Sequence, residues 1–241
     1  MSSEHSTRSP ANAPATSTAS ATSPAAEERF ALLLGGPVTA TARLRRQLEG
    51  RRIIAADSGM RHATPLDLDP ELWIGDFDST PPGLFERHVA VPRIAHPADK
   101  DMTDGALALA AALERGARDI LLVGALEGRT DHALAHLLQL ADLAARGIRA
   151  LASSGREEAH GLAPGHHLVD LPAGTRFSIL GFSPLKSVIL RGARWPLNAE
   201  TIPFASTRPL SNIATGSVEL DIETGTGVLI ASLPETDGDV T

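Results

Sequence analysis

The chain has 241 residues, of which 42% are hydrophobic, enough for one large core or two small ones. Its net charge of −7 and its aromatic content of only 3% argue against a nucleic-acid-binding surface, which is typically basic and rich in stacking aromatics. With no cysteine there can be no disulfide, thiolate zinc site or cysteine nucleophile, and no apolar run approaches the roughly 20 residues of a membrane span, so we expect a cytoplasmic protein without a membrane partner.

The first 28 residues are rich in Ser, Thr, Ala and Pro and have almost no large apolar side chains. Such a segment cannot bury enough surface to offset the entropy lost on ordering, so we predict that residues 1–28 are disordered. The segment also lacks the continuous apolar stretch of a signal peptide, and its acidic residues disfavour a transit peptide. Asp237-Gly238-Asp239 is predicted to belong to a frayed end.

From residue 29 to residue 153, continuous apolar runs alternate with helical patterns. The apolar runs cover 30–34, 53–56, 72–74 and 120–123, and the helical patterns cover about 42–48, 105–113 and 131–146. Apolar strands separated by helices predict a parallel, Rossmann-like sheet that is covered on both faces. Because such sheets bind ligands at the carboxyl ends of their strands, the loops that follow the strands should share one rim. These loops are 35–36, 57–59, 75–79 and 124–129.

After residue 153 the pattern changes to short alternating segments. Residues 154–164 are rich in Gly, Glu and other polar residues and are predicted to be a linker. The alternating segments that follow are 175–182, 187–190, 217–222 and 227–232, bounded by Gly, Pro and Asn. They predict an antiparallel β-sandwich domain over residues 165–234, so the fold class is α/β with a second, all-β domain.

Two acidic clusters are the most informative feature of the predicted rim. Asp76 and Asp78 follow the strand 72–74, and in extended geometry their side chains share a face, where hard oxygen ligands suit Mg²⁺. Such a pair can equally be a turn whose carboxylates cap backbone N–H groups. The second cluster, Lys100 to Asp104, lies at a predicted helix start, where Asp101 or Thr103 is expected to act as N-cap. Because grouped carboxylates repel one another, a bound cation explains both clusters better than fold stability does.

The segment Gly128-Arg129-Thr130-Asp131-His132 places a cation at another helix start. Backbone N–H groups there favour anions, and an arginine can hold a phosphate through two parallel hydrogen bonds. The alternatives are that Arg129 forms a surface ion pair with Glu127 and that Asp131 only caps the helix.

Other residues are weaker indicators of function. His132 and His136 have helical spacing, but on an Ala/Leu helix such a pair more often packs or faces solvent than binds zinc. Gly35-Gly36 lacks the full G-x-G-x-x-G spacing of a dinucleotide site. Trp195, followed by Ser211-Asn212 in a later loop, would ordinarily be a core residue.

Taken together, six segments resemble the motifs of the thiamine pyrophosphokinase family in order and spacing. They are Asp57-Ser58-Gly59, Gly75-Asp76-Phe77-Asp78-Ser79, Lys100-Asp101-Met102-Thr103-Asp104, Gly128-Arg129-Thr130-Asp131-His132, Gly192-Ala193-Arg194-Trp195-Pro196-Leu197 and Ser211-Asn212. The resemblance spans about Phe30 to Ser232. It implies an N-terminal α/β domain for ATP and Mg²⁺, a C-terminal β-sandwich for thiamine and dimerisation, and a homodimer with active sites near the subunit interface. The implied reaction is Mg²⁺-dependent transfer of diphosphate from ATP to thiamine, with release of AMP.

The resemblance also implies roles for individual residues. Asp76, Asp78 and Asp104 would bind Mg²⁺ on the triphosphate, and one of them would help to take the hydroxyl proton. The remaining nucleotide contacts would come from Asp57, Lys100, Thr103, Arg129 and Asp131, of which Lys100 and Arg129 neutralise phosphate oxygens. Trp195 would stack on the cationic thiamine ring, and Ser211 and Asn212 would complete that pocket. Two departures from the family pattern are Ser58 and Glu127, which stand where glycine is usual.

Two other functions fit parts of the sequence. A haloacid-dehalogenase-like phosphatase also uses an Asp pair after a strand, but it leaves the C-terminal motifs unexplained. A non-catalytic nucleotide sensor would bind ATP without turnover, and its usual signature is the loss of an acidic ligand, which this chain does not show.

Overall fold

The structure is a computed structural model that describes residues 25, 28–78, 80–97, 99 and 101–234. The predictions of a disordered N-terminal tail and a frayed C-terminus concern residues that lie almost entirely outside this set. Lys100, which we expect to contact phosphate, also lies outside it.

The predicted alternation of strands and helices is present in the first two thirds of the chain. Its strands are β1 (Arg29–Leu33), β2 (Arg52–Ala56), β3 (Leu72–Gly75), β4 (Arg93–Ala95), β5 (Asp119–Val123) and β6 (Arg149–Ser153). Its helices are α1 (Ala42–Leu48), α2 (Ala63–Leu66), α3 (Pro82–Arg87), α4 (Asp104–Glu114) and α5 (Thr130–Ala145), with a 3₁₀ helix, η2 (Asp57–His62), between β2 and α2. The remaining strands are β7 (Glu157–Leu162), β8 (Gly165–Val169), β9 (Arg176–Gly181), β10 (Leu185–Ala193), β11 (Leu197–Ile202), β12 (Asn212–Ile222) and β13 (Gly227–Ser232).

Within the described part of the chain, 13 strands form one sheet in the order β11-β10-β12-β9-β13-β7-β6-β5-β1-β2-β3-β4, and β8 pairs with β12. Strands β6 to β4 in this order are parallel to one another, and the pairs from β6–β7 onward are antiparallel. The mixed α/β class is therefore confirmed. No helix of the described residues is long and apolar enough to cross a membrane.

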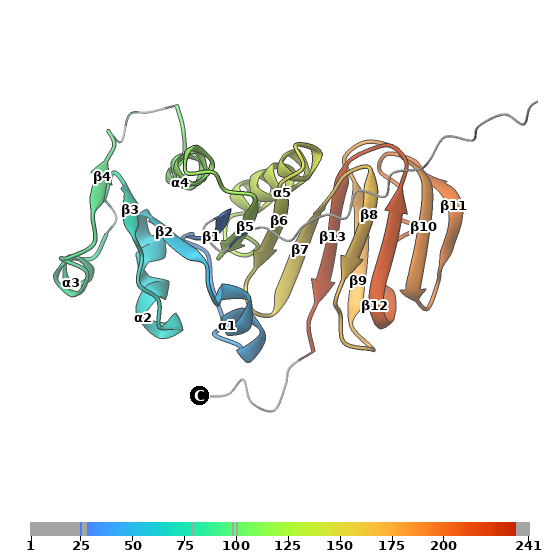
Figure 1. The fold of residues 1–241 in the computed structure, drawn as a ribbon, viewed down its shortest axis with the longest axis horizontal. Helices are drawn as coiled ribbons and strands as arrows, with labels where there is room; N and C mark the ends of the chain where they lie inside the picture. The colour runs from blue at the N-terminus through green and yellow to red at the C-terminus, as the bar shows by residue number, and fades with distance from the viewer. Residues whose placement is uncertain (1–24, 26–27, 79, 98, 100, 235–241) are drawn as a thin grey trace, which may run out of the picture.

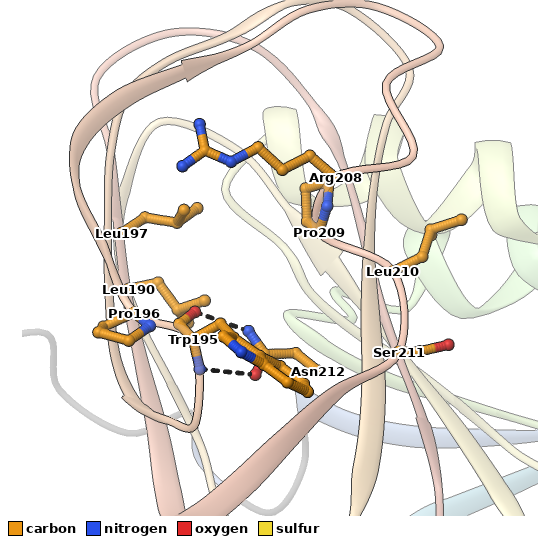
Figure 2. A pocket seen from close by; sticks show the side chains of 9 residues that line it. All are labelled: Leu190, Trp195, Pro196, Leu197, Arg208, Pro209, Leu210, Ser211 and Asn212. Carbon is orange, nitrogen blue, oxygen red and sulfur yellow. Dashed lines mark hydrogen bonds between the residues drawn. The ribbon is translucent and has the colours of Figure 1, made fainter.

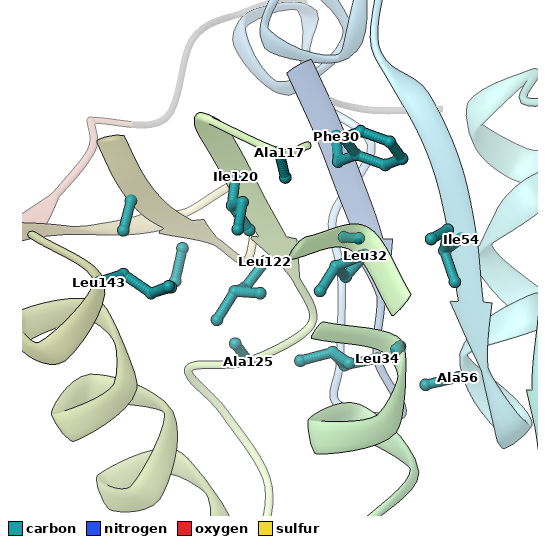
Figure 3. Close-up of a cluster of buried hydrophobic side chains, with 14 of the residues drawn as sticks. Phe30, Leu32, Leu34, Ile54, Ala56, Ala117, Ile120, Leu122, Ala125 and Leu143 are labelled. Atoms are coloured by element: carbon teal, nitrogen blue, oxygen red, sulfur yellow. The ribbon is translucent and has the colours of Figure 1, made fainter. Parts of the chain in front are cut away.

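Helices cover both faces of the parallel strands, as expected for buried apolar runs (Figure 1). Side chains alternate along a strand, so Leu32 of β1 packs on one face, against α4 and α5, whereas Leu33 packs on the other, against α1 and α2. Figure 3 shows the first of these cores, with Leu32, Ile54 and Leu122 directed into the same layer. This packing fixes the strand ends that form the rim.

The predicted linker 154–164 is wrong in its central part, because residues 157–162 form strand β7. This strand joins β6 to β13, so the sheet continues across the expected domain boundary. The polar sequence hides the strand, since its buried Glu158 is neutralised by hydrogen bonds from Arg43 of α1, at 2.6 and 2.9 Å. A paired carboxylate can be buried where an unpaired one cannot.

The antiparallel strands form two layers around a second core. Phe177 and Leu229 of one layer pack with Leu190 and Leu220 of the other. In this region the alternating patterns locate β9, β10, β12 and β13 but not the polar strand β11, whose burial pattern shows only its end residues facing inward.

Candidate functional site

The predicted rim loops lie at the same edge of the sheet. Strands β1, β2, β3 and β5 are neighbours and parallel, so the segments after them begin at the same end. Gly36 N–H, after β1, donates to Gly124 O, after β5, at 3.0 Å. A Cβ at Gly36 would lie 2.4 Å from that same oxygen, so only glycine permits this contact.

The loop after β2 is packed equally closely against its neighbours. A Cβ at Gly59 would lie 2.1 Å from Leu33 O. The hydroxyl of Ser58 lies 2.9 Å from the position that a Cβ at Gly35 would take, so this departure from the family pattern occupies space that Gly35 leaves open.

Asp57 is held between β2 and β3. Its carboxylate Oδ1 accepts a hydrogen bond from Thr80 Oγ1 at 3.0 Å, and its carbonyl accepts one from Trp73 Nε1 at 2.8 Å. Gly75 leaves room for it, because a Cβ there would lie 3.1 Å from Asp57 Cα. The sequence places this aspartate at the rim correctly.

Asp76 and Asp78 follow β3 in a turn and not in an extended strand, so the argument from extended geometry is wrong. Phe77 between them has a left-handed backbone with φ of 62°, and Asp78 N–H donates to Asp76 Oδ1 at 3.2 Å. The Phe77 ring packs edge-on against Trp73, with ring centroids 5.2 Å apart, and this contact stabilises the turn. Both carboxylates nevertheless remain at the end of β3, on the rim.

Thr103 and Asp104 begin α4 as predicted. Thr103 is the N-cap, and its hydroxyl accepts a hydrogen bond from Ala106 N at 3.2 Å. The next residue, Gly105, faces the rim, because a Cβ there would lie 3.3 Å from Leu34 Cδ2 and 3.7 Å from His136 Nε2. Asp104 therefore stands beside the loops after β1 and β5.

The three aspartates predicted to bind Mg²⁺ do not form a ready-made metal cage. Among the described residues, no three His, Cys, Asp or Glu side chains are close enough together to hold a metal ion. In chemical type the donors fit Mg²⁺, which takes one or two carboxylates and completes its shell with phosphate and water oxygens. The metal site remains a prediction that involves Asp76, Asp78 and Asp104.

Arg129 forms its ion pair with Asp131 and not with Glu127. The guanidinium Nη2 and Nε donate to the two carboxylate oxygens at 2.6 and 3.2 Å. The hydrogen bonds and charge of this pair raise the pKa of Arg129 and lower that of Asp131, so both are charged at neutral pH. Both side chains are more than half exposed, so the pair contributes little to stability and can open toward a ligand.

The contacts of His132 and His136 on α5 support the interpretation that these histidines are packing residues and not zinc ligands. His136 donates from Nδ1 to Ala125 O, at 3.0 Å, since a carbonyl can only accept. Burial lowers the pKa of His136, which keeps it neutral. Its ring packs edge-on against that of His132, with centroids 6.3 Å apart.

Trp195 is not a core residue. It is 54% exposed and lines a cavity of about 570 Å³ between β10, β11 and the loop before β12 (Figure 2). Leu190 and Leu197 form apolar walls, and Arg208 lies at one side. The Arg194 guanidinium lies 5.0 Å from the Trp195 ring centroid, so the indole already contacts one cation.

Asn212 lines the same cavity, but its amide is used to hold Trp195. Its Nδ2 donates to Trp195 O at 2.8 Å, and its Oδ1 accepts from Trp195 N and Ile213 N at 3.1 and 2.8 Å. The side chain is 4% exposed. The neighbouring Ser211 has a left-handed backbone, and in Figure 2 its hydroxyl points away from Trp195. In this geometry Asn212 supports the pocket wall more than it offers groups to a ligand.

The acidic rim and the Trp195 cavity do not meet within one chain. Strands β3 and β9 are seven strand steps apart, on the order of 30 Å, and β10 and β11 lie still farther along the molecule (Figure 1). One chain thus carries two separate halves of the predicted site.

Sequence reasoning missed two rim residues, Arg61 and His62, at the end of η2. His62 Nε2 donates to Gly36 O at 2.9 Å, and burial, together with the charge of Arg61, lowers the pKa of His62 so that it is neutral. Arg61 Nη2 donates to the carbonyls of Gly35 and Gly36. Their spacing from Asp57, about one helical turn, is the signal that could have placed them beside the first loop.

Comparisons with known proteins show what this sequence and fold resemble. Residues 48–152 match a family model described as thiamin pyrophosphokinase, catalytic domain, whereas no curated protein matches the chain by sequence. A thiamine pyrophosphokinase structure from Bacillus subtilis matches with a TM-score of 0.75 and 24% identity, covering 86% of this chain and 100% of that one. A thiamin pyrophosphokinase family protein from Enterococcus faecalis gives a TM-score of 0.72 at 25% identity, covering 86% of this chain and 100% of that one. The thiamin pyrophosphokinase from Candida albicans gives a TM-score of 0.71 at 13% identity, covering 87% and 90%.

The sequence match covers the rim aspartates but not β1 or the loop after it, and the structural matches, which span 86% of the chain, extend beyond it to the antiparallel strands. The chain is therefore similar to thiamin pyrophosphokinases in sequence over residues 48–152, and it shares their fold over most of its length.

Proposed function

We propose that the protein is a thiamine diphosphokinase, which uses ATP to convert thiamine to thiamine diphosphate and AMP. One observation carries the proposal: two features occur together on the family fold. One is an acidic rim suited to a metal-bound triphosphate, and the other is a cavity walled by an exposed indole. Together they offer one site to a phosphate donor and another to a cationic aromatic acceptor.

In the proposed reaction the hydroxyethyl oxygen of thiamine attacks the β-phosphorus of ATP. The bond from that phosphorus to the oxygen bridging the α- and β-phosphates breaks, and AMP leaves with the bonding electrons. The hydroxyl proton passes to a carboxylate of the rim, one of Asp76, Asp78 and Asp104. The protein's contribution is chiefly positioning and charge neutralisation.

The rim residues divide this work among them. Asp76, Asp78 and Asp104 would hold Mg²⁺, which supplies charge neutralisation at the phosphate oxygens when bound. Asp57, fixed by Thr80, and Thr103, at the start of α4, would orient the nucleotide. Arg129 would exchange part of its contact with Asp131 for phosphate, and Lys100 would add a second cation.

The complete site would combine the rim of one chain with the Trp195 cavity of a second copy. This arrangement is supported by the separation of the two halves within one chain and makes the active protein a homodimer. Trp195 would offer the ring face not used by Arg194 to thiamine, and Asn212 would keep the tryptophan loop in place.

Product analysis tests the reaction. The purified protein is incubated with ATP, Mg²⁺ and thiamine, and the products are separated. We expect equal amounts of AMP and thiamine diphosphate. ADP with thiamine monophosphate would contradict the proposal, and phosphate without a modified acceptor would indicate the phosphatase alternative. ATP binding without any turnover would indicate a nucleotide sensor.

Mixing two inactive variants tests the shared site. Asp78→Asn removes a rim carboxylate and Trp195→Ala removes the indole, and each alone should abolish or strongly reduce turnover without changing the circular dichroism spectrum. If each site joins two chains, a mixed dimer contains one intact site. After subunit exchange the mixture should then regain about a quarter of the wild-type activity, as half of the dimers are mixed. A mixture of confirmed mixed dimers that stays inactive would contradict a site shared between chains.

A further inference from the structure

The rim contains a cation that the sequence motifs do not indicate. Arg61 is the fifth residue of η2, and its side chain extends to the carbonyls of Gly35 and Gly36 in the loop after β1. These contacts hold the exposed guanidinium at the carboxyl edge of the sheet, next to the loop after β5.

Gly36 of this loop does not offer its backbone N–H to a phosphate. The N–H of Gly36 donates to Gly124 O, at 3.0 Å, and is not directed to a ligand. Its carbonyl accepts from His62 Nε2 at 2.9 Å. The carbonyls of the glycine loop therefore face η2. They orient Arg61, and the loop does not itself form a phosphate cradle.

The charges at the rim make this arginine distinctive. Among the residues that the structure describes, Arg61 has no ion pair, whereas the guanidinium of Arg129 is held by both oxygens of Asp131. A guanidinium has five N–H donors, so two carbonyl contacts leave donors for another acceptor. The rim also carries several carboxylates, which would repel a polyanion unless cations compensate them. These are Asp57, Asp76, Asp78, Asp104 and Asp131.

We propose that Arg61 is a phosphate-binding residue for the nucleotide, oriented by the carbonyls of Gly35 and Gly36. The proposal rests on the proposed function, since it assumes that a nucleoside triphosphate binds at this rim. The guanidinium geometry favours contact with two oxygens of one phosphate or of neighbouring phosphates.

Calorimetric binding of MgATP and of adenosine tests this role. Arg61→Gln should weaken MgATP binding about 10-fold or more and make its dissociation constant less dependent on salt, while adenosine binding stays unchanged. Arg61→Lys keeps the charge without the planar fork and should be intermediate. The matched control is Arg45→Gln on α1, because Arg45 is also exposed and also donates to a backbone carbonyl, that of Pro65. It should bind both ligands like the wild type.

Three results would overturn the inference. The first is wild-type MgATP affinity in Arg61→Gln. The second is an equal loss of MgATP and adenosine binding, which would show that Arg61 only stabilises the loop. The third is a wild-type protein that binds no MgATP, in which case the proposed function fails as well. In the first two cases the wild-type protein still binds nucleotide, so only the role of Arg61 is lost.

Discussion

The buried carboxylate of Glu158 should account for a large and pH-dependent part of the protein's stability. It is fully buried on β7 and accepts hydrogen bonds from Arg43 Nε and Nη2 of α1, and from Gln47 Nε2 at 2.6 Å. Burial alone would raise the pKa of Glu158, but hydrogen bonds from His160 and Arg43 outweigh it and hold the pKa at about 2. The contact ties α1, which follows the first rim loop, to the strand that joins the parallel and antiparallel parts of the sheet.

The magnitude follows from this pKa. A depression from 4.5 to about 2 corresponds to about 3 kcal/mol of stability at neutral pH, since each unit is worth about 1.4 kcal/mol. Removal of one partner from a buried ion pair has a similar cost, about 3–5 kcal/mol. Glu158→Gln should therefore lower the free energy of unfolding by about 3 kcal/mol and the melting temperature by about 6–12 °C.

The pH dependence distinguishes this charge effect from a simple packing defect. Because the folded-state pKa lies below that of the unfolded chain, the contribution is complete above about pH 4.5 and is lost as the pH falls to about 2. Urea unfolding followed by circular dichroism should show the gap between wild type and Glu158→Gln narrowing by about 1.4 kcal/mol between about pH 7 and pH 3.5.

The control is Glu157→Gln on the same strand, which is only half-buried and whose side chain contacts Ser232. It should change stability by less than about 0.5 kcal/mol at any pH in this range. The reasoning would be refuted if Glu158→Gln were as stable as the wild type. A constant gap between about pH 7 and pH 3.5 would also refute it, because the loss would then not arise from the carboxylate charge.

The remaining predictions concern the pocket, the rim and the metal. Asn212→Asp replaces the donor to Trp195 O with an acceptor. We therefore expect about a 10-fold higher KM for thiamine, little change in kcat and altered acrylamide quenching of the exposed Trp195. An unchanged KM would contradict the supporting role of Asn212. Gly59→Ala would press a methyl group against Leu33 O and should prevent folding or lower the melting temperature markedly. The control Gly83→Ala, whose added methyl group meets no atom within 4 Å, should not. Equal melting temperatures for the two variants would disprove the packing argument. A divalent-cation chelator should abolish turnover, excess Mg²⁺ should restore it, and full activity with the chelator present would exclude the metal.

Local pattern was sufficient to predict strands β1, β2, β3 and β5 and helices α1, α4 and α5, but not β4, β6, α2 or α3. Short continuous apolar runs such as 120–123, bounded by helical patterns, indicate strands buried on both faces, and the Ala/Leu run after Asp104 has a high helix propensity. Since parallel neighbours end at the same edge, the position of Asp57, Asp76 and Asp104 at one rim also followed from the sequence. The helix start was also predicted from local sequence, with Asp101 or Thr103 as N-cap, and the structure shows that Thr103 is the cap.

Only the tertiary structure showed which residues pair with the charged side chains Glu158, Arg129 and Arg61. The strand containing Glu158 looked like a linker because its partner, Arg43, is 115 residues away in the chain. The pairing of Arg129 with Asp131 and the orientation of Arg61 by Gly35 and Gly36 depend on side-chain paths that no spacing rule fixes.

The sequence thus determined the elements and the edge at which the acidic residues lie, because these depend on the periodicity of a few consecutive side chains. The structure decided that Trp195 is exposed, that Asn212 holds it, and that the cavity lies at the end of the sheet opposite the rim. Those features depend on contacts between segments that are distant in the chain. Such contacts can form, and contribute to the free energy of folding, only once the strands have assembled in order.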